Sequence, residues 1–140
     1  MARYNRINLD GVSDTKSGIV TAQTLAGTFL KFNAGTGKFV AATAATLLEK
    51  YYVANINQTS VLITDPILAG GYVNAEILSN NRELAGMVAI SQTVLVDSPL
   101  TLTTGGMLKV ATGVEVVVGW STEALTTDGT TPQLVKFLAA

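Results

Sequence analysis

The chain of 140 residues contains no cysteine and no histidine. Without cysteine it can form neither a disulfide framework nor a thiolate site, and its redox compartment cannot be inferred. Without histidine it lacks the commonest metal ligand and the commonest general base at neutral pH. A Ser–His pair is therefore impossible. The sequence predicts a protein that is not an enzyme and has no catalytic, metal or cofactor site.

Charge is also scarce. Charged residues make up 14% of the chain, against about 25% in ordinary soluble domains. Nine Lys and Arg against ten Asp and Glu leave a net charge of −1, and no basic stripe exists, so nucleic acid is not an expected partner. No apolar run approaches the roughly 18 residues of a membrane span, and no signal-peptide core follows Met1. We therefore expect no membrane partner and a surface suited to packing against other subunits, although a surface rich in Thr, Ser and Asn would give the same composition.

The strongest pattern in the chain lies between Pro99 and Leu125. Two alternating segments flank the turn at Gly105-Gly106, where positive φ costs little, so the pattern predicts a β-hairpin. A second turn at Thr112-Gly113 leads to an apolar alternation that predicts one buried strand face. Its expected members are Val114, Val116, Val118 and Trp120. We predict that the last three are buried together with three residues of other strands, Leu102, Leu108 and Phe39.

Similar short strands are expected throughout the rest of the chain, because turn signals recur about every eight to twelve residues. The expected strands lie near residues 28–32, 38–41, 51–56, 60–64, 72–78, 82–90 and 134–138. Residues 42–50 are rich in Ala and Leu and form either a short helix or a loop with one turn. The absence of strand–helix alternation argues against a parallel α/β fold, and no internal repeat of fixed period is convincing. The sequence predicts an all-β fold: a single small β-barrel or sandwich of about ten short strands with at most one short helix.

The first 18 residues are polar and lack sustained periodicity. We expect residues 1–18 to form an extended N-terminal arm and residues 19–140 to form the β domain. A disordered tail is one interpretation. The other is an arm that contacts a neighbouring subunit through the interface residues Arg3, Tyr4, Arg6, Ile7 and Leu9.

Several short motifs suggest chemistry, and each has a simpler structural explanation. Gly35-Thr36-Gly37-Lys38 lacks the first glycine of a phosphate-binding loop and the Ser or Thr after its lysine, so a turn is expected. Asp128-Gly129-Thr130 also fits a turn. Asp65, Asp97 and Glu76 would need to meet in space to act as acid and base, whereas single carboxylates at strand ends are usually turn caps. Asp10 and Asp14 give only a weak calcium pattern.

The order of these segments resembles the small head decoration, or capsid cement, proteins of tailed bacteriophages. The resemblance covers about residues 19–138. It rests on the order of five segments: the hairpin from Gly27-Thr28-Phe29 to Lys38-Phe39-Val40, the strand Tyr51–Asn55, the segment Ile67–Val73, the strand pair Leu100–Val110 around its glycine turn, and the closing run Val118–Ala124.

The resemblance implies a virion structural protein that binds the outer surface of a phage capsid and bridges neighbouring capsomers without catalysis. Its implied partners are the major capsid protein and further copies of itself, as a homo-oligomer and most often a trimer. Its implied location is the outer capsid surface, after synthesis in the host bacterial cytoplasm. The alternative function is a carbohydrate- or receptor-binding β module of a fibre or adhesin. That alternative requires Tyr51, Tyr72 and Trp120 to lie exposed on one surface.

Overall fold

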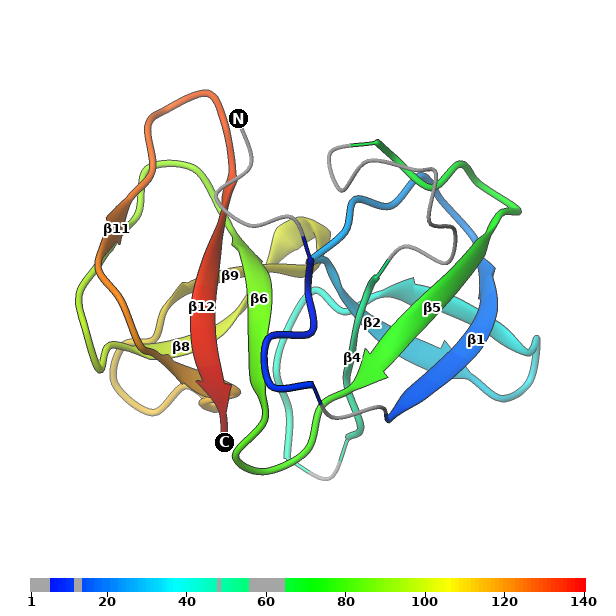
Figure 1. Cartoon of the computed structure of the whole chain (residues 1–140), viewed down its shortest axis with the longest axis horizontal. Helices are drawn as coiled ribbons and strands as arrows, with labels where there is room; N and C mark the ends of the chain where they lie inside the picture. The colour runs from blue at the N-terminus through cyan, green and yellow to red at the C-terminus, as the bar shows by residue number, and fades with distance from the viewer. Residues whose placement is uncertain (1–5, 12–13, 48, 56–64) are drawn as a thin grey trace.

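A computed structural model describes residues 6–11, 14–47, 49–55 and 65–140, and all structural statements concern these residues. The fold is all-β, as expected. Twelve strands and one 3-10 turn account for the regular structure of the described chain. Most of the strands belong to two closed barrels of five strands each, which lie side by side in Figure 1.

Barrel 1 is built from the N-terminal half of the chain. Its strands are β1 (Thr15–Val20), β2 (Phe29–Asn33), β3 (Lys38–Ala41), β4 (Tyr52–Val53) and β5 (Tyr72–Ile77). They pair in the closed order β1-β3-β2-β4-β5. Only the β1–β3 pair is parallel, with Val20 opposite Phe39.

Barrel 2 is built from the C-terminal half. Its strands are β6 (Glu83–Val88), β8 (Pro99–Thr103), β9 (Met107–Val110), β10 (Gly119–Ser121) and β12 (Gln133–Ala139). The 3-10 turn η1 (Thr104–Gly106) joins β8 to β9. A separate two-stranded sheet pairs β7 (Thr93–Val94) with β11 (Leu125–Thr126).

The two barrels have the same topology. If β6, β8, β9, β10 and β12 are matched to β1 to β5 in chain order, the closed order of barrel 2 becomes identical to that of barrel 1. The parallel pair is again the first strand with the third, through Val88 and Leu108. The register also agrees: Gly18 lies opposite Val73, and its counterpart Gly86 lies opposite Val135. The expected small β-barrel is therefore present twice, and the two copies are related by topology and register, not by a repeated sequence.

Matching backbone hydrogen bonds extend the repeat into the turns. In barrel 1, the N–H of Gly27 donates to the carbonyl of Ala54 at 2.9 Å. In barrel 2, the N–H of Asp97 donates to the carbonyl of Ser121 at 2.7 Å. Gly27 and Asp97 both have positive φ, of 93° and 66°. The turn 25–28 of barrel 1 and the turn 95–98 of barrel 2 are therefore counterparts.

Each barrel packs its own interior, and the reason is the period of two in its strands. The residues that line barrel 1 are Val20, Leu30, Phe39, Tyr52, Ala54, Val73 and Ala75. Leu84, Val88, Leu100, Leu102, Leu108 and Phe137 belong to the second and larger cluster. That cluster also contains residues of barrel 1, among them Phe29 and Val53, so it fills the junction between the barrels as well as the interior of barrel 2.

Most expected strands are confirmed. The two hairpins, the strand 72–77 with Val73 and Ala75 buried, the strand 83–88 and the closing strand form where the patterns predicted them. The described part of segment 42–50 contains no helix, so its loop interpretation holds. The expected strand 60–64 lies outside the described residues.

The expected strand through Val114 to Trp120 is mostly wrong. Only Gly119–Ser121 forms a strand there, and its buried positions are Gly119 and Ser121. Val118 is buried as predicted, but Trp120 is 42% exposed and Val114 is fully exposed. The physical reason is space: a Cβ on Gly119 would lie 2.7 Å from the ring of Phe137, so this interior position accepts no side chain. The larger Trp120 therefore points outward.

The expected arm of residues 1–18 is also only partly separate from the barrels. Residues 15–18 belong to β1, which pairs with β5 from Thr15 to Ile19. Ile7 is fully buried in the core of barrel 2. The described part of the arm is thus built into the domain.

Candidate interaction surface

The segment 6–11 adds an extended piece to the edge of β6. Asn8 forms a bridge with Leu84, the N–H of Leu9 donates to the carbonyl of Glu83, and the N–H of Ala85 donates to the carbonyl of Ile7. In Figure 1 this dark-blue segment runs between β6 and β5. Ile7 is therefore an anchor to the chain's own barrel, and Leu9 packs beside it.

The remaining expected interface residues fall outside this anchor. Arg6 is exposed. Arg3 and Tyr4 lie outside the described residues. Of the five expected contacts, the structure thus places Ile7 and Leu9 against β6 and leaves Arg6 accessible.

A buried ion cluster joins the segment 6–11 to both barrels. The Arg82 guanidinium, just before β6, lies 2.9 Å from Glu76 Oε1 on β5 and 3.3 Å from Asp10 Oδ1. Asn8 and Asn55 donate further hydrogen bonds to the Glu76 carboxylate. Burial alone would lower the pKa of Arg82, but the hydrogen bonds to Asp10 and Glu76 outweigh it and raise that pKa. The cluster is fully paired, so it has the character of a structural clamp.

The direct interface between the barrels is formed by an outward surface of barrel 1, which we call the docking face. Its members are apolar residues that point away from the barrel 1 interior and belong to the core cluster of barrel 2: Ala26, Phe29, Ala42 and Val53. The ring of Phe29 lies 5.6 Å from that of Phe137. The N–H of Met87 on β6 donates to the carbonyl of Gly27 at 2.9 Å.

Barrel 2 receives this face with β6, β12 and the turn η1, which we call the receiving face. A Cβ added to Gly27 would lie 3.5 Å from Met87 Cβ and would also strike the side chain of Leu134. A Cβ on Gly106 of η1 would lie 2.5 Å from the carbonyl oxygen of Phe29. The two backbones thus approach as closely as glycine allows, and both glycines have positive φ.

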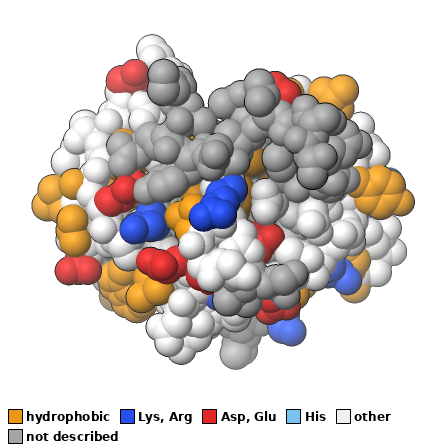
Figure 2. Space-filling view, in the orientation of Figure 1, with side chains coloured by type: hydrophobic (Ala, Val, Ile, Leu, Met, Phe, Trp, Pro, Cys, Tyr) orange, Lys and Arg blue, Asp and Glu red, His pale blue; other side chains and the backbone are white. Residues whose placement is uncertain are grey.

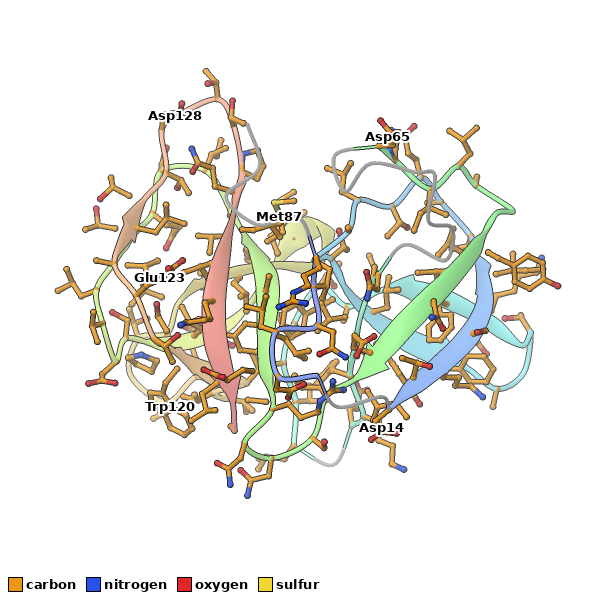
Figure 3. The ribbon with its side chains drawn as sticks, in the orientation of Figure 1. Asp14, Asp65, Met87, Trp120, Glu123 and Asp128 are labelled. Carbon is orange, nitrogen blue, oxygen red and sulfur yellow. The ribbon has the colours of Figure 1, made fainter. Side chains whose placement is uncertain are left out.

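The docking face has a counterpart on barrel 2, and this counterpart is partly exposed, with Pro99 and Ala111 half-buried. The matched positions are Val96, Pro99, Ala111 and Trp120. Val96 is 58% exposed and Trp120 42%, and the neighbouring Leu95 is 62% exposed. Figure 3 places Trp120 at the lower edge of barrel 2, away from the junction between the barrels where Met87 lies.

This surface was not identified from the sequence. The apolar run Val94-Leu95-Val96 before Asp97 was its only sign, and it fitted a buried strand equally well. Figure 2 shows hydrophobic side chains gathered at both lateral margins of the molecule. On the barrel 1 side, Leu68 and Tyr72 are exposed.

The three aromatic residues that the sugar-binding alternative requires do not share a surface. Tyr51 is buried, while Tyr72 is 60% exposed. Tyr72 begins β5 in barrel 1, and Trp120 lies at the lower edge of barrel 2. A concavity of about 450 Å³ on barrel 1, between β2, β3 and residues 49–52, contains the half-buried Phe32 and the Lys31–Glu49 pair, whose Nζ and Oε2 atoms are 3.9 Å apart. A platform for stacking sugars is therefore not supported.

The carboxylates considered for catalysis hold local structure. Glu76 binds Arg82, and Asp97 lies in the exposed turn after β7. Asp128 accepts hydrogen bonds from the N–H groups of Thr130 and Thr131, which lower its pKa and confirm the turn. In the part of the chain that the structure describes, no group of three or more acidic side chains could hold a metal ion.

The glycine-rich motif around Gly35 and Gly37 also forms a turn. Residues 33–37 form the β2–β3 turn, in which the N–H of Gly37 donates to the carbonyl of Asn33. Among the described residues, no helix is long and apolar enough to cross a membrane.

Comparison with known proteins gives a similar fold and no sequence family. No family model matches the chain, and no curated protein matches it. Among solved structures, the chain is similar to the N-terminal base of the head fiber protein gp8.5 of bacteriophage phi29, with a TM-score of 0.55. The likeness covers 90% of this chain and 92% of that one at 12% sequence identity. At this identity the likeness concerns the fold.

Proposed function

We propose that this protein is a non-enzymatic structural protein of a phage virion, which binds the outer capsid surface and bridges neighbouring capsomers. The fold shared with a phage head fiber base over nine-tenths of both chains carries the proposal. The order of strand and turn motifs, which resembles capsid decoration proteins, supports it independently. The proposed partners are the major capsid protein and further copies of this chain, in a trimer.

The composition of the surface suits this role. Most exposed large apolar side chains lie on turns and outer strand faces of both barrels, and net charge is only −1. Each contact with a shell would be modest, but many symmetric copies would make the total resistance to internal pressure large. Binding would depend little on salt because few charges are available for steering.

Arg6 is the described residue that remains available for the proposed contact at the N-terminal end, and Arg3 and Tyr4 complete it. Because Ile7 is part of the core, a test variant has to retain residues 7–9. We expect deletion of residues 1–5 combined with Arg6→Ala to leave the unfolding midpoint unchanged and to weaken binding to particles. Lys50→Ala, which removes an exposed cation from the loop before β4, is the control.

The function is tested on phage particles purified with and without the protein. We expect a fixed ratio of the protein to the major shell protein in intact particles. Particles that lack it should release their genome at a lower temperature or under milder osmotic shock. Identical release curves together with absence of the protein from purified particles would overturn the proposal.

A further inference from the structure

We infer that copies of this chain join head to tail by repeating the interface between its two barrels. The exposed counterpart of the docking face, on barrel 2 of one copy, would pack on the counterpart of the receiving face, on barrel 1 of the next. The inference rests on the self-association included in the proposed function, and it is independent of binding to a shell. It assigns a second copy of this chain to surfaces that are otherwise without an occupant in the described structure.

The donating side follows from the repeat. Inside the chain, barrel 1 inserts Ala26, Phe29 and Val53 into the core of barrel 2. The same register positions of barrel 2 carry Val96, Pro99 and Trp120, which are also apolar. The pairing proves the match: Phe29 lies opposite Val53, and Pro99 lies opposite Trp120. A surface that is buried in one barrel is therefore repeated in the other with its apolar character kept, and there Val96 and Trp120 stay exposed while Pro99 is half-buried.

The receiving side follows in the same way. Met87 and Leu134 pair with each other and receive the turn 25–28. Their counterparts in barrel 1 are Ile19 and Tyr72, which also pair with each other. Ile19 is half-buried and Tyr72 is 60% exposed. The position of Gly106, which approaches the backbone of Phe29, is taken in barrel 1 by the exposed Gly37, and both have positive φ.

The side chains of the inferred interface differ in size from those of the internal interface, and the differences compensate one another. In the internal interface, Phe29 reaches Gly86, where it shares space with Leu108. In the inferred interface Pro99 takes the place of Phe29, and Phe39 takes the place of Leu108. The ring of Phe39 already covers Gly18, the counterpart of Gly86. The smaller Pro99 of one copy would therefore meet a site on barrel 1 of the next copy that the ring of Phe39 already fills.

The inferred interface also carries charged residues where the internal interface has uncharged ones. Gly27 of the internal interface is replaced by Asp97, and Met107 beside the receiving strand is replaced by Lys38. Lys38 lies opposite Ile19 in the parallel pair and is exposed. A second copy would therefore bring the Asp97 carboxylate toward a lysine. Opposite charges at the edge of an apolar contact favour correct docking.

One feature of the internal interface is not repeated. β3 pairs with β1 at both Ile19 and Val20, whereas β9 pairs with β6 at Val88 only. The edge position used by Met87 to bind Gly27 is thus taken in barrel 1 by β3. We expect the inferred interface to consist of side-chain contacts without that backbone hydrogen bond, and to be weaker than the internal one.

The geometry is heterologous, because two different surfaces meet. In Figure 3 Trp120 lies at the lower edge of barrel 2, and Figure 1 shows β1 and the start of β5 on the side of barrel 1 that faces away from barrel 2. Surfaces placed in this way cannot meet within one chain. Such contacts close into rings when the rotation between copies permits and otherwise form open chains.

The first experiment measures the mass of the full chain in solution against concentration. We expect species larger than the 14.6 kDa of one chain. Val96→Arg should block the donating face and Tyr72→Glu the receiving face, each giving a single-chain mass. An equimolar mixture of the two variants should give species of two chains, because one intact face of each kind remains. Leu47→Glu is the control. Leu47 is exposed, but the loop that carries it already packs at the interface between the two barrels of its own chain, so this variant should associate as the parent does.

The second experiment uses the absence of cysteine from the natural chain. The Gly27 and Met87 positions are close enough for a disulfide, which needs Cβ atoms about 3.5–4.5 Å apart. Asp97→Cys with Ile19→Cys places thiols at their counterparts, and oxidation should link different chains. Asp97→Cys with Asn80→Cys, on the exposed link between the barrels, should give no such links.

A single-chain mass at all concentrations would overturn the inference, and so would association that neither face variant reduces. Failure of the mixture to form two-chain species would exclude the head-to-tail arrangement. The outcome is separable from the proposed function. A protein that stabilises particles but stays monomeric in solution and unlinked on them refutes only this inference, and one that associates without binding particles refutes only the function.

Discussion

Barrel 1 and barrel 2 share one strand order and one register, yet their equivalent outer surfaces differ in burial. The face around Phe29 and Val53 is buried within the chain, while in the equivalent face Val96 and Trp120 are exposed and Pro99 is half-buried. The interiors differ less, since both place a small residue on the first strand beneath a large one on the third. The comparison teaches that the topology fixes which positions point outward, and that only the neighbour decides whether an apolar outward position stabilises the fold.

The largest expected difference is between the two outward aromatic residues. Phe29→Ala should lower the free energy of unfolding by about 3–5 kcal/mol, because it empties a fully buried site between the barrels. Trp120→Ala, on the equivalent face of barrel 2, should cost about 1 kcal/mol or less. Urea denaturation of both variants at a concentration where the chain is monomeric measures the difference. Equal costs would show that this face of barrel 2 is covered by the chain itself.

The ion cluster offers a second contrast. Arg82→Ala should cost about 3–5 kcal/mol, because Glu76 and Asp10 would be left as buried charges without their guanidinium. Lys109→Ala removes a pair of similar length, 2.9 Å to Glu115, on the partly exposed surface of barrel 2. That change should cost about 0–1 kcal/mol. Denaturation midpoints that shift equally would mean that the cluster does not join the barrels.

The matched glycines give a smaller and sharper contrast. A methyl group on Gly86 would meet Leu108, Phe137 and Phe29 at 2.7 to 3.1 Å, whereas on Gly18 its three nearest atoms would all belong to the ring of Phe39. Overpacking costs about 1–3 kcal/mol. Gly86→Ala should therefore fall at the upper end of this range and Gly18→Ala at the lower end, as measured by thermal unfolding. The reverse order would show that the interface yields more easily than the barrel 1 interior.

The smallest expected effect depends on pH and belongs to barrel 2 alone. The N–H of Thr112, followed by Lys109, lowers the pKa of Glu115 from 4.5 to about 2. A carboxyl group with a depressed pKa adds stability that is complete above pH 4.5 and is lost as the pH falls toward 2. Glu115→Gln should remove this loss, so its stability should depend less steeply on pH between 4.5 and 2. Parallel curves for parent and variant would refute the assignment.

The sequence predicted the strands whose alternation and burial agree, and it failed where neighbours overrule alternation. Val73 and Ala75 face inward as their pattern indicated, and the turn at Gly105-Gly106 set the β8–β9 hairpin. Trp120 was misplaced because hydrophobicity alone put it inside. The interior position beside it has room only for Gly119, and this depends on Phe137, a contact that local pattern cannot reveal.

The repeat and the exposed surface were missed for a related reason. Gly18 and Gly86 keep the same place in the register, but Phe39 and Leu108, or Gly27 and Asp97, differ in residue type. What is repeated is the backbone path and the size of the space, and neither is visible as a repeated string of letters. Ile7 was taken for a contact with another subunit because its partner, the edge of β6, lies more than 70 residues further along the chain.

Because barrel 1 is synthesised before barrel 2, the two faces of their interface do not become available at the same time. The last strand of barrel 1 ends at Ile77, and β12 of barrel 2 ends at Ala139. At 5–20 residues per second, a ribosome needs on the order of 3–12 s for that distance. During this interval Phe29 and Val53 have no receiving surface, and the nascent chain exposes an apolar face like the one that the mature protein exposes at Val96 and Trp120. On a crowded polysome, the docking face of one unfinished chain would therefore be able to contact the receiving face of another chain. Slow translation would favour this contact between chains, and fast translation would favour docking of the two barrels within one chain.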